Sequence, residues 1–261
     1  AKTSPYTAEW PQLLVDGSPD DSPEIGLYFG ADGLDRIRTL VQSEPYGSAF
    51  SRMTSTAEKA LEIDPESMIG EFVPWADRRW CRDRDMARPK IFHEMEILAF
   101  VGLVLRREDM RRMAARMALS IAYCGHWTES ILGAFPGATW HHQSFTEGFY
   151  LKACALVLDW AGALFTSAGR EIVMDAMIMK GLPRLESDFM RIEYIRRMNQ
   201  GIHFNSGRIH ALLALATYYP RYSVRIGEAG GDLTEMVDSY VQPDGGTLEL
   251  KAFDIEGRLF D

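Results

Sequence analysis

The chain has 261 residues, of which 46% are hydrophobic and 25% are charged. This is the ordinary composition of a globular protein, and the length suffices for one large domain or two small ones. The net charge of −9 argues against nucleic-acid binding, because non-specific binding to phosphates requires a basic surface. No apolar run approaches the roughly 18 residues of a membrane span, so we expect neither nucleic acid nor a membrane as a partner.

The first part of the chain predicts an irregular arm followed by helices. Residues 1–26 are rich in Pro, Asp, Ser and Gly, which favour loops. Apolar residues at helical spacing then predict four helices, over residues 34–41, 46–63, 91–105 and 109–125. Between the second and third helices, arginines alternate with aspartates. This predicts surface ion pairs or, alternatively, a basic rim for an anionic polymer. The arginines are Arg78, Arg79, Arg82, Arg84 and Arg88.

The second part of the chain predicts four further helices, over residues 144–164, 166–179, 207–219 and 232–241. Asn205 or Ser206 is positioned to cap the 207–219 helix, and Pro220 closes it. Three methionines on the 166–179 helix are expected to fill the core; they are Met174, Met177 and Met179.

These elements predict an all-α fold of antiparallel helix pairs. No repeat at a fixed period is present, so a helical solenoid is not expected. The remaining architectures are a globular α-bundle and an (α/α) toroid, in a single domain over residues 1–261.

The cysteines and the N-terminus indicate little about the compartment. Cys81, Cys124 and Cys154 are an odd number, and the last two lie in apolar helical patterns that predict buried free thiols. The chain begins at Ala1 without a signal peptide, which suggests a processed N-terminus. We expect a periplasmic or secreted location, with the cytoplasm as the alternative.

The densest group of polar side chains lies just before an apolar helix, in residues 198–208. Asn199, Gln200 and His203 combine neutral donors with an imidazole that can act as a base near neutral pH. Arg208 follows in the same segment. We interpret the segment as a binding wall for a polar ligand, the alternative being a polar helix start that caps backbone groups.

Two loops add aromatic and imidazole groups. Trp127 lies in one, and His141 and His142 lie in the other. Such side chains suit a carbohydrate cleft, although an aromatic loop packed under a helix end is the alternative. The two histidines lack a metal-ligand spacing, and no C-x-x-C pair exists. We therefore predict no metal and no cofactor.

Several segments together resemble the heparinase II/III and oligoalginate lyase group. They are, in chain order, Pro23–Phe29 with Asp32–Arg38, Trp140–Ala153, Leu158–Trp160, Met198–Arg208, and Pro243–Glu249. Each motif is moderately specific, and the matches follow the order of the family over nearly the whole chain.

The resemblance implies an incomplete (α/α) toroid, followed in the family by β-sandwich domains that are absent here. It also implies a polysaccharide lyase that cleaves alginate or a glycosaminoglycan at a uronate by β-elimination. Asn199 and Gln200 then correspond to carboxylate-neutralising positions, and His203 to a base or substrate contact. The implied substrate-binding residues are His141, His142, Trp127, Arg208 and Glu147.

The chain departs from the family pattern in two places. Gln200 stands where many relatives have His, and residues 248–261 contain no tyrosine to act as the acid. Ile255–Arg258 spells a protease-recognition tetrapeptide, which suggests that the tail 247–261 is non-native or truncated.

Two other functions stay open. A glycoside hydrolase requires two carboxylates across a cleft, and the candidates are Glu147, Asp159 and Glu193. A non-catalytic glycan-binding domain is the other.

Overall fold

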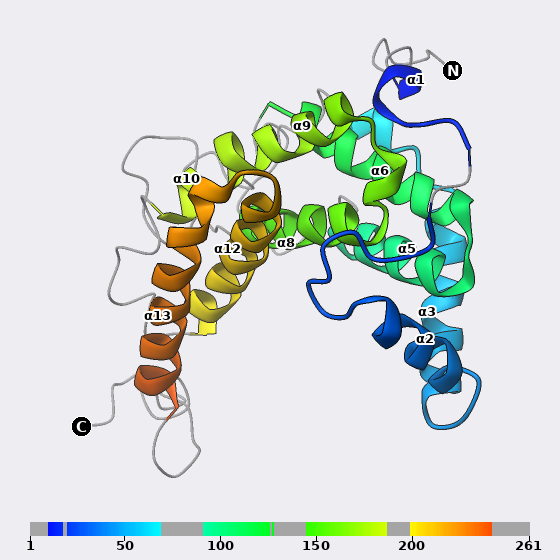
Figure 1. Ribbon diagram of the computed structural model, residues 1–261, viewed down its shortest axis with the longest axis horizontal. Coiled ribbons are helices and arrows are strands. Elements are labelled where there is room, and N and C mark those ends of the chain that lie inside the picture. The colour runs from blue at the N-terminus through cyan, green and yellow to red at the C-terminus, as the bar shows by residue number, and fades with distance from the viewer. Residues whose placement is uncertain are drawn as a thin grey trace, which may run out of the picture. The chain divides into compact units, whose positions relative to one another are not determined.

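The computed structural model describes residues 10–17, 20–68, 91–125, 127, 145–186 and 199–241. Helices dominate these residues (Figure 1), and Leu14 and Phe165 form an isolated β-bridge. The all-α prediction is therefore confirmed. No helix in the described ranges is long and apolar enough to cross a membrane.

The chain divides into two compact units that are each discontinuous in sequence. Unit 1 comprises residues 1–127 and 153–179, and unit 2 comprises residues 128–152 and 180–261. Helix α8 (Phe145–Trp160) contributes its first turns to unit 2 and its remainder to unit 1. This boundary therefore lies inside a continuous helix, where the sequence shows no linker.

Unit 1 is built around helix α6, which contacts α5, α9, η2 and η4. Its elements are α1 (Trp10–Leu13), α2 (Ala31–Leu40), α3 (Tyr46–Ala60), η2 (Pro65–Met68), α5 (Phe92–Leu105), α6 (Glu108–Tyr123), η4 (Gly162–Leu164) and α9 (Ser167–Ala176). The helices predicted from apolar spacing are present with small shifts of their ends. The fully buried side chains on α5 and α6 explain why that spacing was informative.

The guanidinium of Arg111, on helix α6, is not exposed to solvent. Arg111 is buried, and its guanidinium donates to the Trp160 carbonyl at 3.0 Å, to Asp21 Oδ1 at 2.8 Å and to the Asp20 carbonyl at 2.9 Å. Burial lowers the pKa of Arg111. The predicted irregular arm is therefore fastened to the core through this side chain. The arm also contains a helical turn, α1, where the sequence predicted irregular structure.

Asp159 fastens the next part of the arm. Its Oδ1 accepts from the backbone amides of Ile25 at 2.7 Å and Gly26 at 2.8 Å, and its Oδ2 accepts from Leu27 at 2.9 Å. Gly26 has φ +82, in the left-handed region that glycine adopts at little cost. This backbone turn directs three consecutive amides at one fully buried carboxylate.

Glu66 forms a third link, between η2, α1 and α6. Its carboxylate accepts from Trp10 Nε1 at 2.7 Å and from both Nε and Nη2 of Arg116 at 2.7 Å. Burial raises the pKa of Glu66, but hydrogen bonds from Arg116, its own backbone amide and Trp10 outweigh burial and hold that pKa below its ordinary value.

The lowered pKa of Glu66 predicts a specific acid sensitivity. Its stabilising contribution is present above its ordinary pKa of 4.5 and is lost as pH falls through the lower folded-state value. We expect Glu66→Gln to destabilise the protein at pH 7 by about 2 kcal/mol and to flatten the acid side of its stability curve. Urea denaturation from pH 7 to pH 3 measures both effects. Exposed Glu62→Gln is the control, and equal acid slopes in wild type and Glu66→Gln would contradict the prediction.

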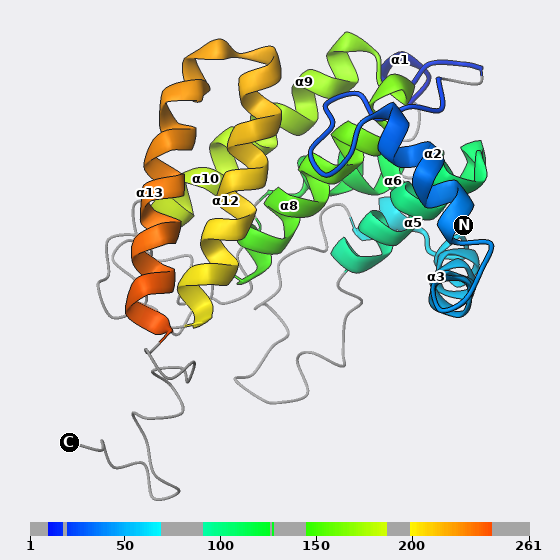
Figure 2. The same cartoon turned by 60° about the horizontal axis from the view of Figure 1, so that its bottom comes forward.

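Unit 2 is organised by a helical hairpin. Helix α12 (Asn199–Tyr218) and helix α13 (Ser223–Tyr240) lie side by side and run antiparallel, joined by η7 (Pro220–Tyr222) (Figures 1 and 2). Helix α10 (Leu182–Arg184) also belongs to this unit. Both hairpin helices begin earlier than predicted. Asn205 and Ser206 therefore lie inside α12, and the prediction that one of them caps it is wrong.

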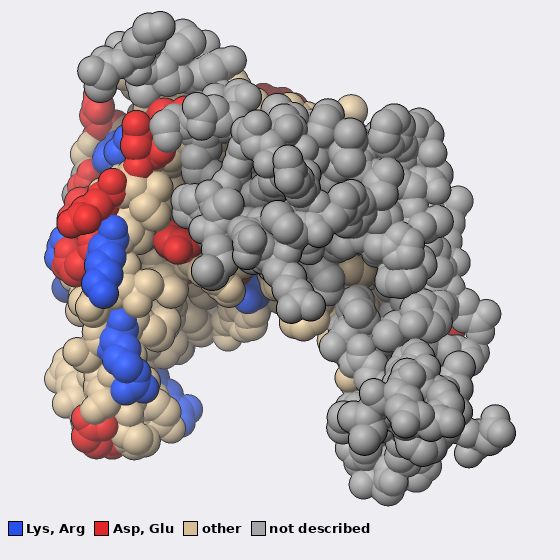
Figure 3. Space-filling model, turned by 180° about the vertical axis from the view of Figure 1, so that it is seen from behind, with Lys and Arg blue, Asp and Glu red and all other residues tan. Residues whose placement is uncertain are grey.

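The smaller predictions about buried residues have mixed outcomes. Cys124 and Cys154 are buried free thiols as predicted, and burial raises the pKa of Cys154 to about 12. Met174 and Met177 are buried, but Met179 is 72% exposed, so its prediction as a core residue is wrong. Acidic and basic side chains are interspersed on the described surface visible in Figure 3.

Candidate functional site

The candidate site is the N-terminal end of helix α12. The first turn of this 20-residue helix contains Asn199 and Gln200 and no acidic residue. His203 lies four residues after Asn199 and three after Gln200, so the three positions share one helical face. First-turn amides have no acceptor within a helix, and the helix dipole favours an anion there.

His203 is positioned at the surface next to helix α8. Its side chain is exposed, and its ring meets that of Phe149 edge-on, with centroids 6.0 Å apart and an interplanar angle of 62°. The imidazole is therefore oriented by packing on one side and is open to solvent on another. Such a group can contact a ligand.

Two glycines set the position of α12 against the first turns of α8. A Cβ atom on Gly207 would lie 2.1 Å from the carbonyl oxygen of Gly148, so the two backbones are in direct contact. On the other side of this contact, an added Cβ on Gly148 would lie 3.5 Å from the Cα atom of Phe204. This close approach holds the first turns of α12, including His203, at a fixed distance from α8.

Arg208 connects the helices of unit 2. Its guanidinium donates from Nε to Glu186 Oε1 at 3.1 Å and from Nη1 to Asp232 Oδ2 at 2.5 Å, and only 8% of the side chain is exposed. Buried Asn205 donates to the Ala229 carbonyl at 2.9 Å and accepts from Arg208 at 3.4 Å. Arg225 also donates to Glu186. Arg208, predicted to bind substrate, is instead engaged by two carboxylates.

Two of the other predicted substrate-binding residues, Trp127 and Glu147, are buried. Trp127 belongs to unit 1, where it is 1% exposed and donates from Nε1 to the Ile121 carbonyl at 2.9 Å. Glu147 is 1% exposed in the first turn of α8. His141 and His142 lie outside the described residues, as do the side chains of Asn199 and Gln200. The arginine cluster at 78–88, Glu193 and residues 247–261 also lie outside them.

The comparisons with known proteins are negative. A scan against protein-family models gives no match, and a search of curated protein sequences gives none either. The lyase resemblance therefore rests on the motifs themselves. Within the described ranges, no group of three His, Cys, Asp or Glu side chains is arranged to hold a metal ion.

The structure brings four of the five motifs of that resemblance together in two pairs, and the fifth, Pro243–Glu249, lies outside the described residues. In unit 1, residues 25–27 of the first motif bind Asp159 of the Leu158–Trp160 motif. In unit 2, Gly148 of the Trp140–Ala153 motif contacts Gly207 of the Met198–Arg208 motif. Sequence reasoning missed Gly148 as the contact of Gly207, and Glu186 and Asp232 as the ion-pair partners of Arg208. No local signal marks them, because each acts through a contact that is distant in sequence.

Proposed function

We propose that the N-terminal end of α12 is the uronate-binding site of a polysaccharide lyase-type domain. The observation that supports this proposal is the placement of Asn199, Gln200 and His203 on one face of the first turns, with His203 exposed and no acid nearby in the turn. The substrate class is a uronate-containing glycan such as alginate or a glycosaminoglycan.

The chemistry of β-elimination explains the choice of side chains. The proton on C5 of a uronate is weakly acidic beside a carboxylate anion, so hydrogen bonds must neutralise that carboxylate. The neutral amides of Asn199 and Gln200, with the backbone amides of the first turn, are suitable donors. His203 takes the C5 proton. The C4–O bond then breaks, a double bond forms between C4 and C5, and the leaving oxygen takes a proton.

The ion pairs of unit 2 favour these amides over Arg208 as the groups that neutralise the substrate carboxylate. Arg208 is already paired with Glu186 and Asp232, so the substrate carboxylate would have to displace a buried carboxylate to reach it. Hydrolysis is less well supported, because the oxygens of Asp159 accept three backbone amides in unit 1 and Glu147 is buried.

The test is turnover of defined uronates. The protein is incubated separately with alginate, heparin, hyaluronan and chondroitin, and the ultraviolet absorbance of unsaturated uronate is followed. We expect absorbance to rise on at least one polymer. Replacing His203 with Ala should lower the rate about a hundredfold, the usual contribution of a general base, while polymer binding is largely retained. His93→Ala is the matched control because His93 is also exposed but lies on α5 in unit 1.

Each alternative function gives a different result. New reducing ends without absorbance would indicate a hydrolase, and binding without either product would indicate a glycan-binding domain. Absorbance that is equal in wild type and His203→Ala would remove His203 from the mechanism.

A further inference from the structure

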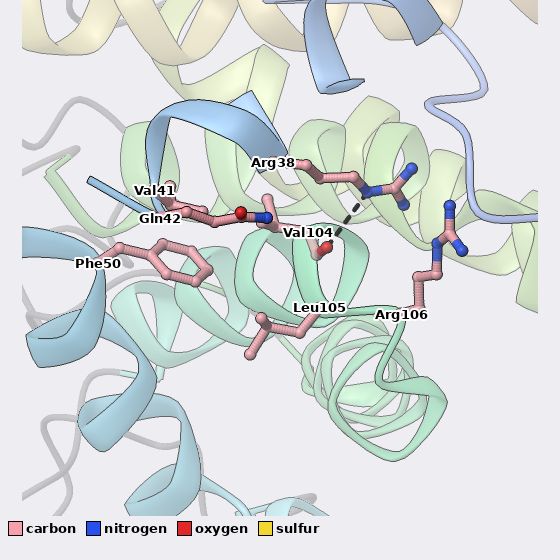
Figure 4. A pocket seen from close by; sticks show the side chains of 7 residues that line it. All are labelled: Arg38, Val41, Gln42, Phe50, Val104, Leu105 and Arg106. Carbon is pink, nitrogen blue, oxygen red and sulfur yellow. Dashed lines mark hydrogen bonds between the residues drawn. The ribbon is translucent and has the colours of Figure 1, made fainter. Parts of the chain in front are cut away.

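A second candidate site lies wholly in unit 1, at the C-terminal end of helix α5. A cavity of about 370 Å³ is lined there by Arg38, Val41, Gln42, Phe50, Val104, Leu105 and Arg106. Figure 4 shows the two arginine side chains on one side of it and the ring of Phe50 on the other. Its volume falls at the lower end of the range for small-molecule sites.

The lining is apolar with a cationic edge. Phe50, Leu105 and two valines supply the apolar part, and Leu105 is 42% exposed. Two arginines and a glutamine supply the polar part, and no lining residue is acidic. Arg38 is also paired with Asp35 at 3.3 Å, so the charge available at this edge is that of Arg106. It favours an anionic ligand with an apolar body.

The two arginines have different roles. Arg38 donates to the carbonyls of Leu103 at 3.0 Å and Val104 at 3.2 Å, which offsets the negative end of the α5 dipole. The Arg106 guanidinium is 66% exposed, and its ion pair with Asp21 is long, at 3.9 Å. It makes no hydrogen bond to any described residue, so its N–H groups are available to a ligand.

The backbone at Arg106 is an independent sign of function. Arg106 ends α5 in the left-handed conformation, with φ 56 and ψ 37. The amide of Arg107 donates to the Gly102 carbonyl at 2.8 Å, which completes a helix C-terminal motif in which glycine is the usual residue at this position. Among the described residues, Arg106 is the sole non-glycine with positive φ. A strained conformation kept with a long cationic side chain indicates that the side chain is used.

We propose that this cavity binds a small organic carboxylate whose apolar body is an aromatic ring or a short acyl chain. The apolar body packs against Phe50 and Leu105. The carboxylate accepts hydrogen bonds from the Arg106 guanidinium, and the Gln42 amide donates at the rim. All of these residues lie in unit 1, so the inference does not depend on the proposed lyase function.

Calorimetric titration of the whole chain with benzoate and hexanoate tests the proposal, with benzyl alcohol and hexanol as neutral counterparts. We expect saturable binding of at least one acid and binding at least about tenfold weaker for its alcohol, because a charge-assisted hydrogen bond is lost. The Arg106→Gly variant should bind the acid at least about tenfold more weakly, yet melt at the same or a higher temperature, since glycine relieves the backbone strain. Gln42→Glu adds a negative charge at the rim and should also weaken binding.

Arg36→Gln is the matched control, because Arg36 is exposed on α2 but does not line the cavity. It should bind the acid as wild type does. The proposal is overturned if wild type binds neither acid, if the acid and its alcohol bind equally, or if Arg106→Gly binds as tightly as wild type.

Discussion

Replacing Gly207 with Ala is expected to destabilise the protein by about 3 kcal/mol or more. The added Cβ would lie 2.1 Å from the Gly148 carbonyl oxygen and 2.7 Å from its carbonyl carbon. Because the obstacle is backbone, no side-chain rotation can relieve the clash, and α12 must move away from α8. We expect urea denaturation to show the loss, and the new position of His203 should also lower any turnover of uronate.

The matched control is Gly148→Ala, which adds the Cβ atom to the other glycine of the contact. An added Cβ on Gly148 would lie 3.5 Å from the Phe204 Cα atom, which is ordinary van der Waals contact. Alanine is also the better helix former by about 1 kcal/mol. Gly148→Ala should therefore change the free energy of unfolding by no more than about 1 kcal/mol. If both variants lost the same stability, the backbone contact between α8 and α12 would not be as close as described.

The apolar spacing of the sequence predicted most helices of unit 1, because those helices bury one face or nearly all of their surface. Helix α5 shows this clearly: Met95, Leu98 and Val101 are fully buried. The same reasoning placed the start of α12 too late. The predicted helix began at Gly207, whereas α12 begins at Asn199 and Gly207 lies inside it, where its backbone contacts α8. A glycine required by close packing cannot be distinguished from a helix-ending glycine without knowing the neighbouring element.

The sequence predicts those features of the candidate site that depend on neighbouring residues of one helix, but not its contacts with other elements. The spacing of Asn199, Gln200 and His203 along one helical face follows from the sequence once the segment is helical. The pairing of Arg208 does not, because its partners Glu186 and Asp232 lie more than 20 residues away in sequence, at separations of 22 and 24. Residue type alone could not distinguish a substrate-binding arginine from one that joins helices.

The second large effect is expected at Asp159, which was a candidate catalytic acid on sequence grounds. Asp159→Asn should destabilise the protein by about 3 kcal/mol, because a buried charged acceptor is lost and the new amide N–H₂ must face a backbone N–H as a second donor. The backbone N–H that loses its acceptor is that of Leu27. The backbone amides of Ile25 and Gly26 still donate to the remaining side-chain oxygen.

Hydrogen exchange distinguishes this role from a catalytic one. If Asp159 holds the arm, the amides of Ile25, Gly26 and Leu27 should exchange faster in Asp159→Asn, while the exposed control Asp175→Asn should leave them unchanged. A carboxylate kept for catalysis is commonly a cost to stability, so its replacement leaves the fold as stable or more stable. An Asp159→Asn variant as stable as Asp175→Asn, with the three amides still protected, would therefore reopen the hydrolase hypothesis. Loss of both stability and protection would identify Asp159 as the side chain that joins the two unit 1 motifs of the lyase resemblance.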